Sequence, residues 1–156
     1  MKIRIISPRE GTLDCGFYEG KKFGLSKADL IDTYIKKVRS VLEMAVPVWH
    51  AALTKSDTAQ IERVQTAALR IILGEEYCSY FDSLVVLELD SLDSRRVQLC
   101  KTFAGKAYKH EKHSKWFWSP DSRPNTRNKT ECTPVWTRTD RYKNSPLPYL
   151  TKLLNS

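Results

Sequence analysis

Apolar residues recur at three- and four-residue steps along much of the chain, which is the spacing that one face of an α-helix requires. The first such stretch covers residues 25–55, and its apolar positions are Leu30, Ile31, Tyr34, Val38, Val41, Leu42, Ala45 and Trp49. Pro47 has no amide hydrogen to donate to the Glu43 carbonyl, so we expect this helix to kink or stop there.

A second helix is predicted by a capping box in which Thr54 and Asp57 satisfy each other's free groups. Its apolar face consists of Ile61, Val64, Ala68, Ile71 and Ile72. Gly74 is the expected residue just after its end, because glycine tolerates the left-handed backbone that often closes a helix.

Two further helices complete the pattern. Ser79 is expected to cap a short third helix that runs through Leu87. The fourth helix is expected to start near Ser91 and to run to about His110. The residues that it should bury are Leu92, Leu99, Cys100, Phe103 and Ala107.

Short connections between the helices favour antiparallel neighbours. The expected fold is therefore all-α, a small antiparallel bundle of about four helices over residues 25–110. Five of the seven prolines follow Trp118, so residues 111–156 are expected to be a basic C-terminal tail that is extended or disordered. Its last stretch, 146–155, is expected to form one or two helical turns, and residues 1–24 stay unassigned.

The net charge of +8 and the isoelectric point near 9.4 favour a polyanionic partner, with nucleic acid first. Lysine and arginine outnumber the acidic residues by only one over residues 25–110. The excess is five over residues 111–156 and two over residues 1–24. We therefore expect the positive charge to lie mostly at the ends of the chain.

The chain contains no apolar run of the roughly 20 residues that a membrane-spanning helix needs. The first residues, MKIRIISPRE, lack the apolar core of a secretory signal. We expect an intracellular protein with no membrane partner. The four cysteines include no CxxC pair, so reduced thiols are favoured over disulfides or a zinc site.

Six segments, in order, resemble the region that follows the polymerase core in the reverse transcriptases of non-LTR (LINE-like) retrotransposons. They are YIKKVRSVLEMAVPVWHAALTKSD, IERVQTAALRIILG, SYFDSL, RRVQLCKTFAGKAYKH, WF and RTDRYKNSPLPYL. The resemblance covers about residues 21–155. It implies a helical region whose first part is similar to the thumb that grips the template–primer duplex. The first 20 residues do not match the preceding palm.

The resemblance does not extend to the chemistry of those enzymes. Nucleotide addition needs paired carboxylates that hold two metal ions, and the chain contains no aromatic-x-Asp-Asp box and no Asp-Asp pair. We therefore expect a protein that is not an enzyme, with no catalytic residues, no metal site and no cofactor.

Three short patterns were weighed as sites. Trp49 and His50 are best explained as a core tryptophan beside an exposed or capping histidine, because no catalytic partner is near in sequence. His110 and His113 lack the spacing of the HExxH zinc signature. Pro120–Asp121 is similar to the start of a restriction-type nuclease motif, but no Glu-x-Lys follows it.

Basic residues are the best candidates for a nucleic-acid-binding surface, although each one is individually typical of a solvated helix face. The candidates on the predicted helices are Lys36, Lys37, Arg39, Arg63, Arg70, Arg95, Lys106 and Lys109. Arg96 falls inside an apolar stripe, which predicts either a carboxylate partner such as Glu88 or a place at the edge of the bundle.

The tail interleaves cations with aromatic rings. Its candidates are Trp116, Arg123, Arg127, Lys129, Trp136, Arg138, Arg141 and Tyr142. Cations neutralise phosphates, and rings stack on unpaired bases. The alternative for this segment is a solvated linker whose tryptophans pack back on the bundle.

The leading hypothesis is a non-catalytic fragment with weak, salt-sensitive and sequence-tolerant binding to RNA or single-stranded DNA. The second is a helical protein-interaction module, for which exposed apolar surface would promote self-association. The third is a transposon remnant without a selected function.

Overall fold

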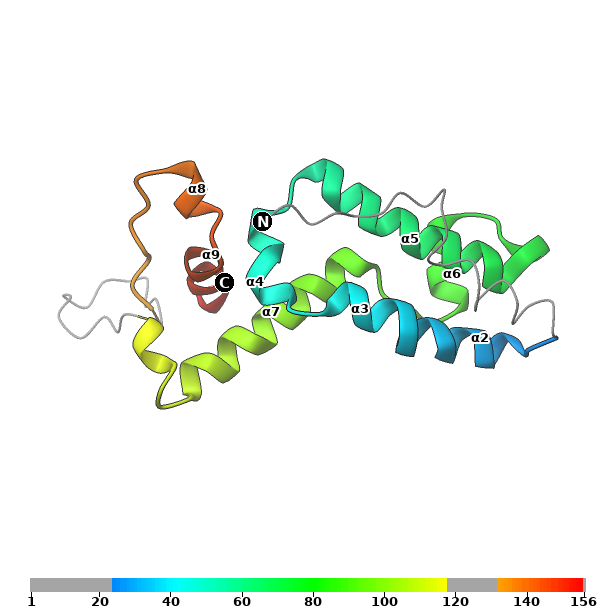
Figure 1. The fold of residues 1–156 in the computed structure, drawn as a ribbon, viewed down its shortest axis with the longest axis horizontal. Coiled ribbons are helices and arrows are strands. Elements are labelled where there is room, and N and C mark those ends of the chain that lie inside the picture. The colour runs from blue at the N-terminus through cyan, green and yellow to red at the C-terminus, as the bar shows by residue number, and fades with distance from the viewer. Residues whose placement is uncertain (1–23, 118–131, 156) are drawn as a thin grey trace. The chain divides into compact units, whose positions relative to one another are not determined.

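The computed structural model describes residues 24–117 and 132–155, and within these ranges the chain is all-α (Figure 1). The expected fold class is confirmed. The α-helices are α2 (Lys27–Thr33), α3 (Ser40–Glu43), α4 (Val46–Trp49), α5 (Lys55–Leu73), α6 (Tyr80–Val86), α7 (Leu92–Lys109), α8 (Asp140–Lys143) and α9 (Pro146–Leu154). A π-helix, η1 (Tyr34–Arg39), joins α2 to α3, and three 3₁₀ turns are η2 (His50–Ala52), η3 (Gly74–Glu76) and η4 (Ser114–Trp116).

The predicted start signals of α5 and α6 are confirmed. The Thr54 hydroxyl accepts from the Asp57 amide at 3.2 Å, and the Asp57 carboxylate accepts from the Thr54 amide at 3.1 Å. The Thr54 hydroxyl also donates to the Asp57 carboxylate at 2.7 Å, and this hydrogen bond, together with the one from the Thr54 amide, holds the pKa of Asp57 below its usual range. Ser79 caps α6 in the same way, through the Asp82 amide. Gly74, at φ 59°, follows the last residue of α5.

The break expected at Pro47 is also present. Helix α3 ends at Glu43, Met44 is extended, and Ala45 adopts a left-handed backbone with φ 54°. Pro47 then lies in the first turn of α4, where a missing amide costs nothing. Because Pro47 has no amide hydrogen, it cannot continue α3 and is well placed in the first turn of α4.

The π-helix changes which residues face inward after Tyr34. A π turn bonds i to i+5, so it holds one residue more than an α turn and shifts the helical stripe by one position. Arg39 and Glu43 are consequently turned inward, with side chains only 17% and 15% exposed. Val41 is 66% exposed, and Ala45 is exposed too. The prediction that these two residues continue the apolar face was wrong, for Val41 because of the π turn and for Ala45 because the helix ends at Glu43.

Helix α7 confirms the predicted fourth helix but not all of its buried face. Leu92, Cys100 and Ala107 are buried, and Leu99 is half-buried. Phe103 was expected in the core and is 39% exposed, whereas the neighbouring Ala104 is buried at 1%. The helix packs through a small side chain at this point, so the large ring lies outside.

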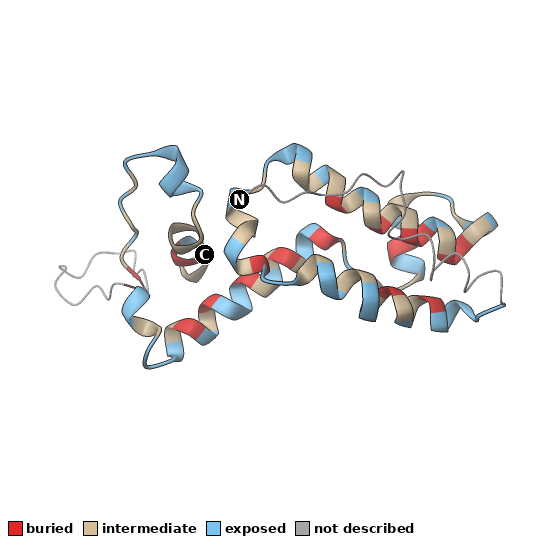
Figure 2. Ribbon diagram, in the orientation of Figure 1, coloured by how far each residue is buried: buried red, intermediate tan, exposed pale blue. Residues whose placement is uncertain are grey.

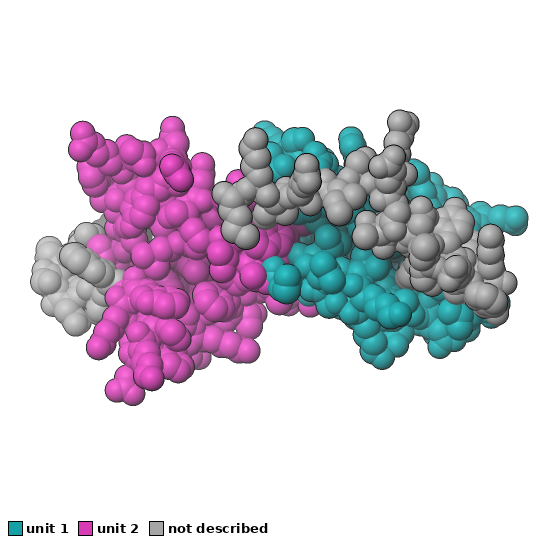
Figure 3. Space-filling view, in the orientation of Figure 1, with its two compact units in different colours: residues 1–44, 54–93 teal, residues 45–53, 94–156 magenta. Residues whose placement is uncertain are grey.

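The chain divides into two compact units, coloured in Figure 3. Unit 1 contains residues 1–44 and 54–93, and unit 2 contains residues 45–53 and 94–156. These units do not follow the expected boundary near residue 110. Within unit 1, α2 and α5 are in contact and run in opposite directions (Figure 1).

Each unit has its own apolar core, visible as the buried positions in Figure 2. The core of unit 1 consists of Leu30, Tyr34, Ala68 and Ile72. The core of unit 2 consists of Val46, Cys100, Ala104, Ala107, Phe117, Cys132 and Leu150. Its members come from α4, α7 and α9, from Phe117 just after η4 and from the segment around Cys132, so the two ends of this unit's sequence are packed together.

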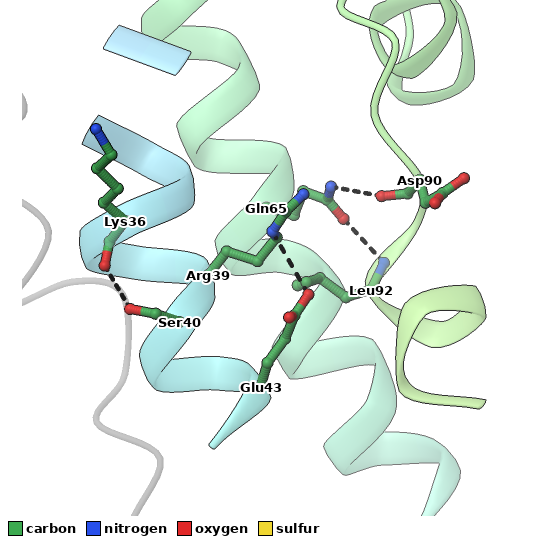
Figure 4. A network of polar contacts seen from close by, with 7 residues as sticks. All are labelled: Lys36, Arg39, Ser40, Glu43, Gln65, Asp90 and Leu92. Atoms are coloured by element: carbon green, nitrogen blue, oxygen red, sulfur yellow. Dashed lines mark hydrogen bonds and ion pairs between the residues drawn. The ribbon is translucent and has the colours of Figure 1, made fainter. Parts of the chain in front are cut away.

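A buried glutamine organises the polar interior of unit 1 (Figure 4). Gln65 is fully buried in α5; its carboxamide donates to the Asp90 carbonyl at 3.0 Å and accepts from the Leu92 amide at 3.1 Å. The Glu62 carboxylate accepts from the Asp93 amide at 2.7 Å. Two side chains of α5 thus satisfy the first free amides of α7, which would otherwise lack partners.

The C-terminal residues are more ordered than the expected tail. Helix α9 has nine residues, so it exceeds the expected one or two turns. Leu150 is 3% exposed, and Cys132 exchanges two backbone hydrogen bonds with the Asn155 side chain. Residues 118–131, where much of the extended tail was expected, lie outside the described residues.

Candidate nucleic-acid interface

Positive charge is concentrated in unit 2. Its described residues carry eleven lysines and arginines against two carboxylates, a net charge of +9. The described residues of unit 1 carry seven against eleven, a net charge of −4. The change of sign falls between Asp93 and Ser94, inside α7, rather than at the ends of the chain as expected. A polyanion is therefore attracted mainly to unit 2.

The end of α7 passes into a series of tight turns over residues 109–116, here called the 109–116 turn. The amides of His110, His113 and Trp116 each donate to a carbonyl three residues earlier, at 3.3, 3.0 and 3.0 Å. Side chains three residues apart are aligned in such 3₁₀-type turns. The sequence KHEKHSKW repeats with a period of three, with lysines at 109, 112 and 115 and rings at 110, 113 and 116.

The rings of this turn form a continuous series of tilted ring contacts, called the ring stack below. The centroids of His110 and His113 are 4.6 Å apart with an interplanar angle of 32°, and those of His113 and Trp116 are 4.4 Å apart at 45°. The Lys112 amide also donates to Nδ1 of His110 at 3.3 Å, which fixes that ring. Trp116 at the end of the stack is 46% exposed, so its ring can accept a base.

Three exposed lysines accompany the stack at the same spacing, namely Lys109, Lys112 and Lys115. Glu111 is the single carboxylate within the turn. Single-stranded nucleic acid presents phosphates and unpaired bases side by side along its length. A row of cations beside a row of rings matches that alternation.

The turn is attached to the core of unit 2 by the residue that follows it. Phe117 is 5% exposed and lies edge-on to Tyr108, with centroids 6.1 Å apart at an interplanar angle of 76°. Phe117 also belongs to the buried cluster with Cys100 and Ala107. The ring stack therefore lies between two packed elements, the buried Phe117 at one end and α7 at the other.

The predicted binding residues of unit 1 are engaged to different degrees. Lys36 forms an ion pair with Asp32 at 2.6 Å, and Arg39 pairs with Glu43 at 3.4 Å (Figure 4 draws the Arg39 pair). The guanidinium of Arg70 lies 5.2 Å from the centroid of Tyr77. Lys37, Arg63 and Arg70 are exposed, whereas Arg39 is half-buried.

The predicted residues of unit 2 are mostly accessible. Arg95 is half-buried, and the exposed ones are Lys106, Lys109, Trp116, Trp136, Arg138, Arg141 and Tyr142. The structure brings Lys109 and Trp116 together in the 109–116 turn. Trp136 is 81% exposed, so it does not pack back as the linker alternative required. Arg123, Arg127 and Lys129 lie outside the described residues.

Sequence reasoning missed Lys112 and Lys115 and considered His110 and His113 only as metal ligands. The signal was present as a three-residue repeat, which is not the period of an α-helix and was therefore overlooked. Arg96, for which the sequence predicts either a carboxylate partner or a place at the edge of the bundle, is only 1% exposed and so does not lie at an edge. Glu88, the carboxylate suggested as its partner, is exposed.

The His50 imidazole and the Cys100 thiol are potentially reactive groups that pack within unit 2. His50 is half-buried, and its Nε2 lies 3.0 Å from the Tyr149 hydroxyl of α9, while Trp49 packs against the core of unit 2. Trp49 is thus a core residue as predicted, and His50, which is not exposed, is the C-cap residue of α4, as one of the two expected alternatives had it. Burial raises the pKa of the Cys100 thiol to about 11, against a smaller lowering by Arg96.

Cys78, Cys100 and Cys132 are all free thiols, in agreement with the sequence. The described residues contain no group of three or more potential ligands that could hold a metal ion. None of the described helices combines the length and the apolar character that crossing a membrane requires. No protein-family model, no curated protein and no solved structure matches this chain, so its function must be inferred from its residues and their geometry.

Proposed function

We propose that this protein binds single-stranded nucleic acid, RNA or DNA, without catalysing a reaction on it. The observation that carries the proposal is the 109–116 turn, where three exposed lysines run beside a ring stack in a unit of net charge +9. Charge and stacking attract every sequence alike, so the binding is sequence-tolerant.

The resemblance to the region after the polymerase core of LINE-like reverse transcriptases supports the same proposal. That region belongs to proteins that hold nucleic acid. Two segments of the resemblance, RRVQLCKTFAGKAYKH and WF, flank the 109–116 turn and include Lys109, His110 and Trp116 of it. The absence of an Asp-Asp pair from the sequence supports binding without nucleotide addition.

Fluorescence anisotropy of a labelled uridine oligonucleotide, titrated with the full chain at several salt concentrations, tests the proposal. We expect affinity to fall steeply with salt. Replacing Lys109, Lys112 and Lys115 together by glutamine should lower the slope of log K against log salt by about 2, at about 0.7 per phosphate contact in a single strand.

The matched control removes the same charge from unit 1, by replacing exposed Lys37, Lys55 and Arg63 with glutamine. We expect this variant to keep nearly the slope of the unaltered chain. Binding that is absent at low salt, or equal losses in the two triple variants, would contradict the proposal. A thymidine oligonucleotide and a DNA duplex in the same titration define which strand type is preferred.

A further inference from the structure

Helix α6 of unit 1 presents apolar side chains to solvent. Ser83 and Leu84 are buried on its inner side. The exposed positions are Phe81, Asp82, Val85 and Val86, and three of the four are apolar. Phe81 is 75% exposed, Val85 78% and Val86 67%. These four residues are called the outer face of α6 below.

A helix that is apolar on both sides is normally covered on both sides. The inner side of α6 is fixed within unit 1, because Ser79 caps the helix and the Tyr80 hydroxyl lies 2.9 Å from Oε1 of Gln65. Phe81 and Val85 are one turn apart, so they form a continuous strip rather than scattered contacts. Such a strip marks an interaction surface more often than isolated apolar residues do.

The surroundings of this strip define the charge of its partner. Between Arg70 and Arg95 the sequence contains no lysine or arginine and six carboxylates, which are Glu75, Glu76, Asp82, Glu88, Asp90 and Asp93. All six are exposed at the residue level. Glu76 pairs with Lys27 at 2.6 Å, and with six carboxylates and no lysine or arginine this stretch of the sequence has a negative net charge. Phosphates are repelled here, so the partner must combine apolar groups with cations.

The chain itself carries a segment of that kind in unit 2. Residues 136–143, WTRTDRYK, contain three cations against one carboxylate. Trp136 is 81% exposed and Tyr142 is 42% exposed, and Arg138, Arg141 and Lys143 are exposed as well. Aromatic and arginine side chains are the ones that most often dominate protein interfaces.

We propose that the outer face of α6 docks the 136–143 segment of a second copy of this chain. The contact is heterologous, since each copy offers an acidic apolar surface to its neighbour and a basic aromatic one to the next. A strip of three apolar side chains buries little area, so association is weak and reversible. It is independent of the nucleic-acid binding proposed above, and it is measured without nucleic acid.

Sedimentation velocity of the nuclease-treated full chain over a concentration series tests this. We expect the weight-average mass to rise above that of one chain as concentration increases, and less so at high salt. The double variant Phe81→Ser, Val85→Thr should raise the dissociation constant at least about tenfold, as expected when central apolar contacts are removed. The matched control is Val41→Thr, at a residue 66% exposed on α3, which should associate like the unaltered chain.

A mixing experiment distinguishes this contact from other modes of association. The variant Trp136→Ser, Arg141→Ser keeps its α6 face and should also be monomeric alone. Mixed with the α6 variant, it should form heterodimers, because one intact pair of surfaces remains. A chain that stays monomeric at every concentration, a control as impaired as the α6 variant, or a mixture without heterodimers would each overturn the proposal.

Discussion

The two units of this chain are built on different principles. Unit 1 adds a buried polar network to its apolar core, in which Gln65 and Glu62 of α5 bind the first amides of α7. Unit 2 is joined by small and apolar groups, with Cys100, Ala104 and Cys132 at its centre. Their described residues carry net charges of −4 and +9.

This difference shows that the net charge of +8 is distributed unevenly between the two units. An acidic unit and a strongly basic unit are linked in one chain, so a polyanion and a basic partner are attracted to different units. The comparison can be tested at the packing level and at the binding level.

The largest expected effect on the free energy of unfolding comes from removing the buried side-chain carboxamide of Gln65 in unit 1. Gln65→Ala leaves the Leu92 amide and the Asp90 carbonyl without their partner, which should lower the free energy of unfolding by about 3 kcal/mol. Gln98→Ala, at an exposed position of α7, is the control and should change it by less than about 0.5 kcal/mol. Urea unfolding followed by circular dichroism measures both; similar losses would show that Gln65 is not the organising residue.

The cysteines provide a comparison of reactivity between the units. Cys78 of unit 1 is exposed, whereas Cys100 of unit 2 is fully buried with a pKa raised to about 11. Because the thiolate is the reactive form, Cys100 should react with iodoacetamide near pH 8 at least about a hundredfold more slowly than Cys78. Peptide mapping by mass spectrometry gives both rates, and comparable rates would contradict the packed core of unit 2.

Aromatic residues separate the units in binding. Trp116→Ala removes the exposed end of the ring stack and should weaken oligonucleotide binding about tenfold with little change in salt slope, since stacking and not charge is lost. Phe81→Ala, at a ring 75% exposed on unit 1, should leave the affinity unchanged. Anisotropy titrations measure the affinity of both variants. Weaker binding by Phe81→Ala would show that nucleic acid contacts unit 1, which contradicts the proposal that it binds unit 2.

The smallest expected effect concerns Tyr34. Its hydroxyl is buried and has no hydrogen-bond partner among residues 24–117 and 132–155, so Tyr34→Phe should stabilise the chain by about 1 kcal/mol at neutral pH. Burial also raises the pKa of Tyr34, so the unaltered protein should lose stability as the pH rises past the ordinary tyrosine value of about 10. The variant should lose less over that range.

Urea unfolding at neutral and at alkaline pH checks both parts of the Tyr34 prediction. Tyr142→Phe is the control, because Tyr142 is 42% exposed in unit 2 and its hydroxyl meets solvent. Equal alkaline losses in the unaltered chain and in Tyr34→Phe would show that this phenol is not desolvated in the folded protein.

Local signals were readable from the sequence because they act over three or four residues. The capping groups of Thr54 and Ser79 fix the starts of α5 and α6, and Pro47 fixes a helix end. The inward rotation of Arg39 and Glu43 was not readable, since it depends on a π turn that no residue in the sequence marks. Composition predicts a polyanionic partner, but only the fold assigns the positive charge to one unit.

The candidate site was recovered in part for a similar reason. Lys109 and Trp116 were chosen individually, as a cation and a ring, without the geometry that joins them. Their alignment depends on 3₁₀-type turns after α7, where the period of three replaces that of 3.6. Lys112 and Lys115 become candidate binding residues only when the period of three in this turn is known.

Lysine footprinting with an acetylating reagent, with and without a uridine oligonucleotide, tests most directly whether nucleic acid binds unit 2. Lys109, Lys112 and Lys115 are exposed on unit 2, and Lys37 and Lys55 are exposed on unit 1, so all five react in the unbound chain. The account predicts that the oligonucleotide slows acetylation of the first three and leaves the other two unchanged. Protection of Lys37 and Lys55 with no protection in the 109–116 turn would contradict it.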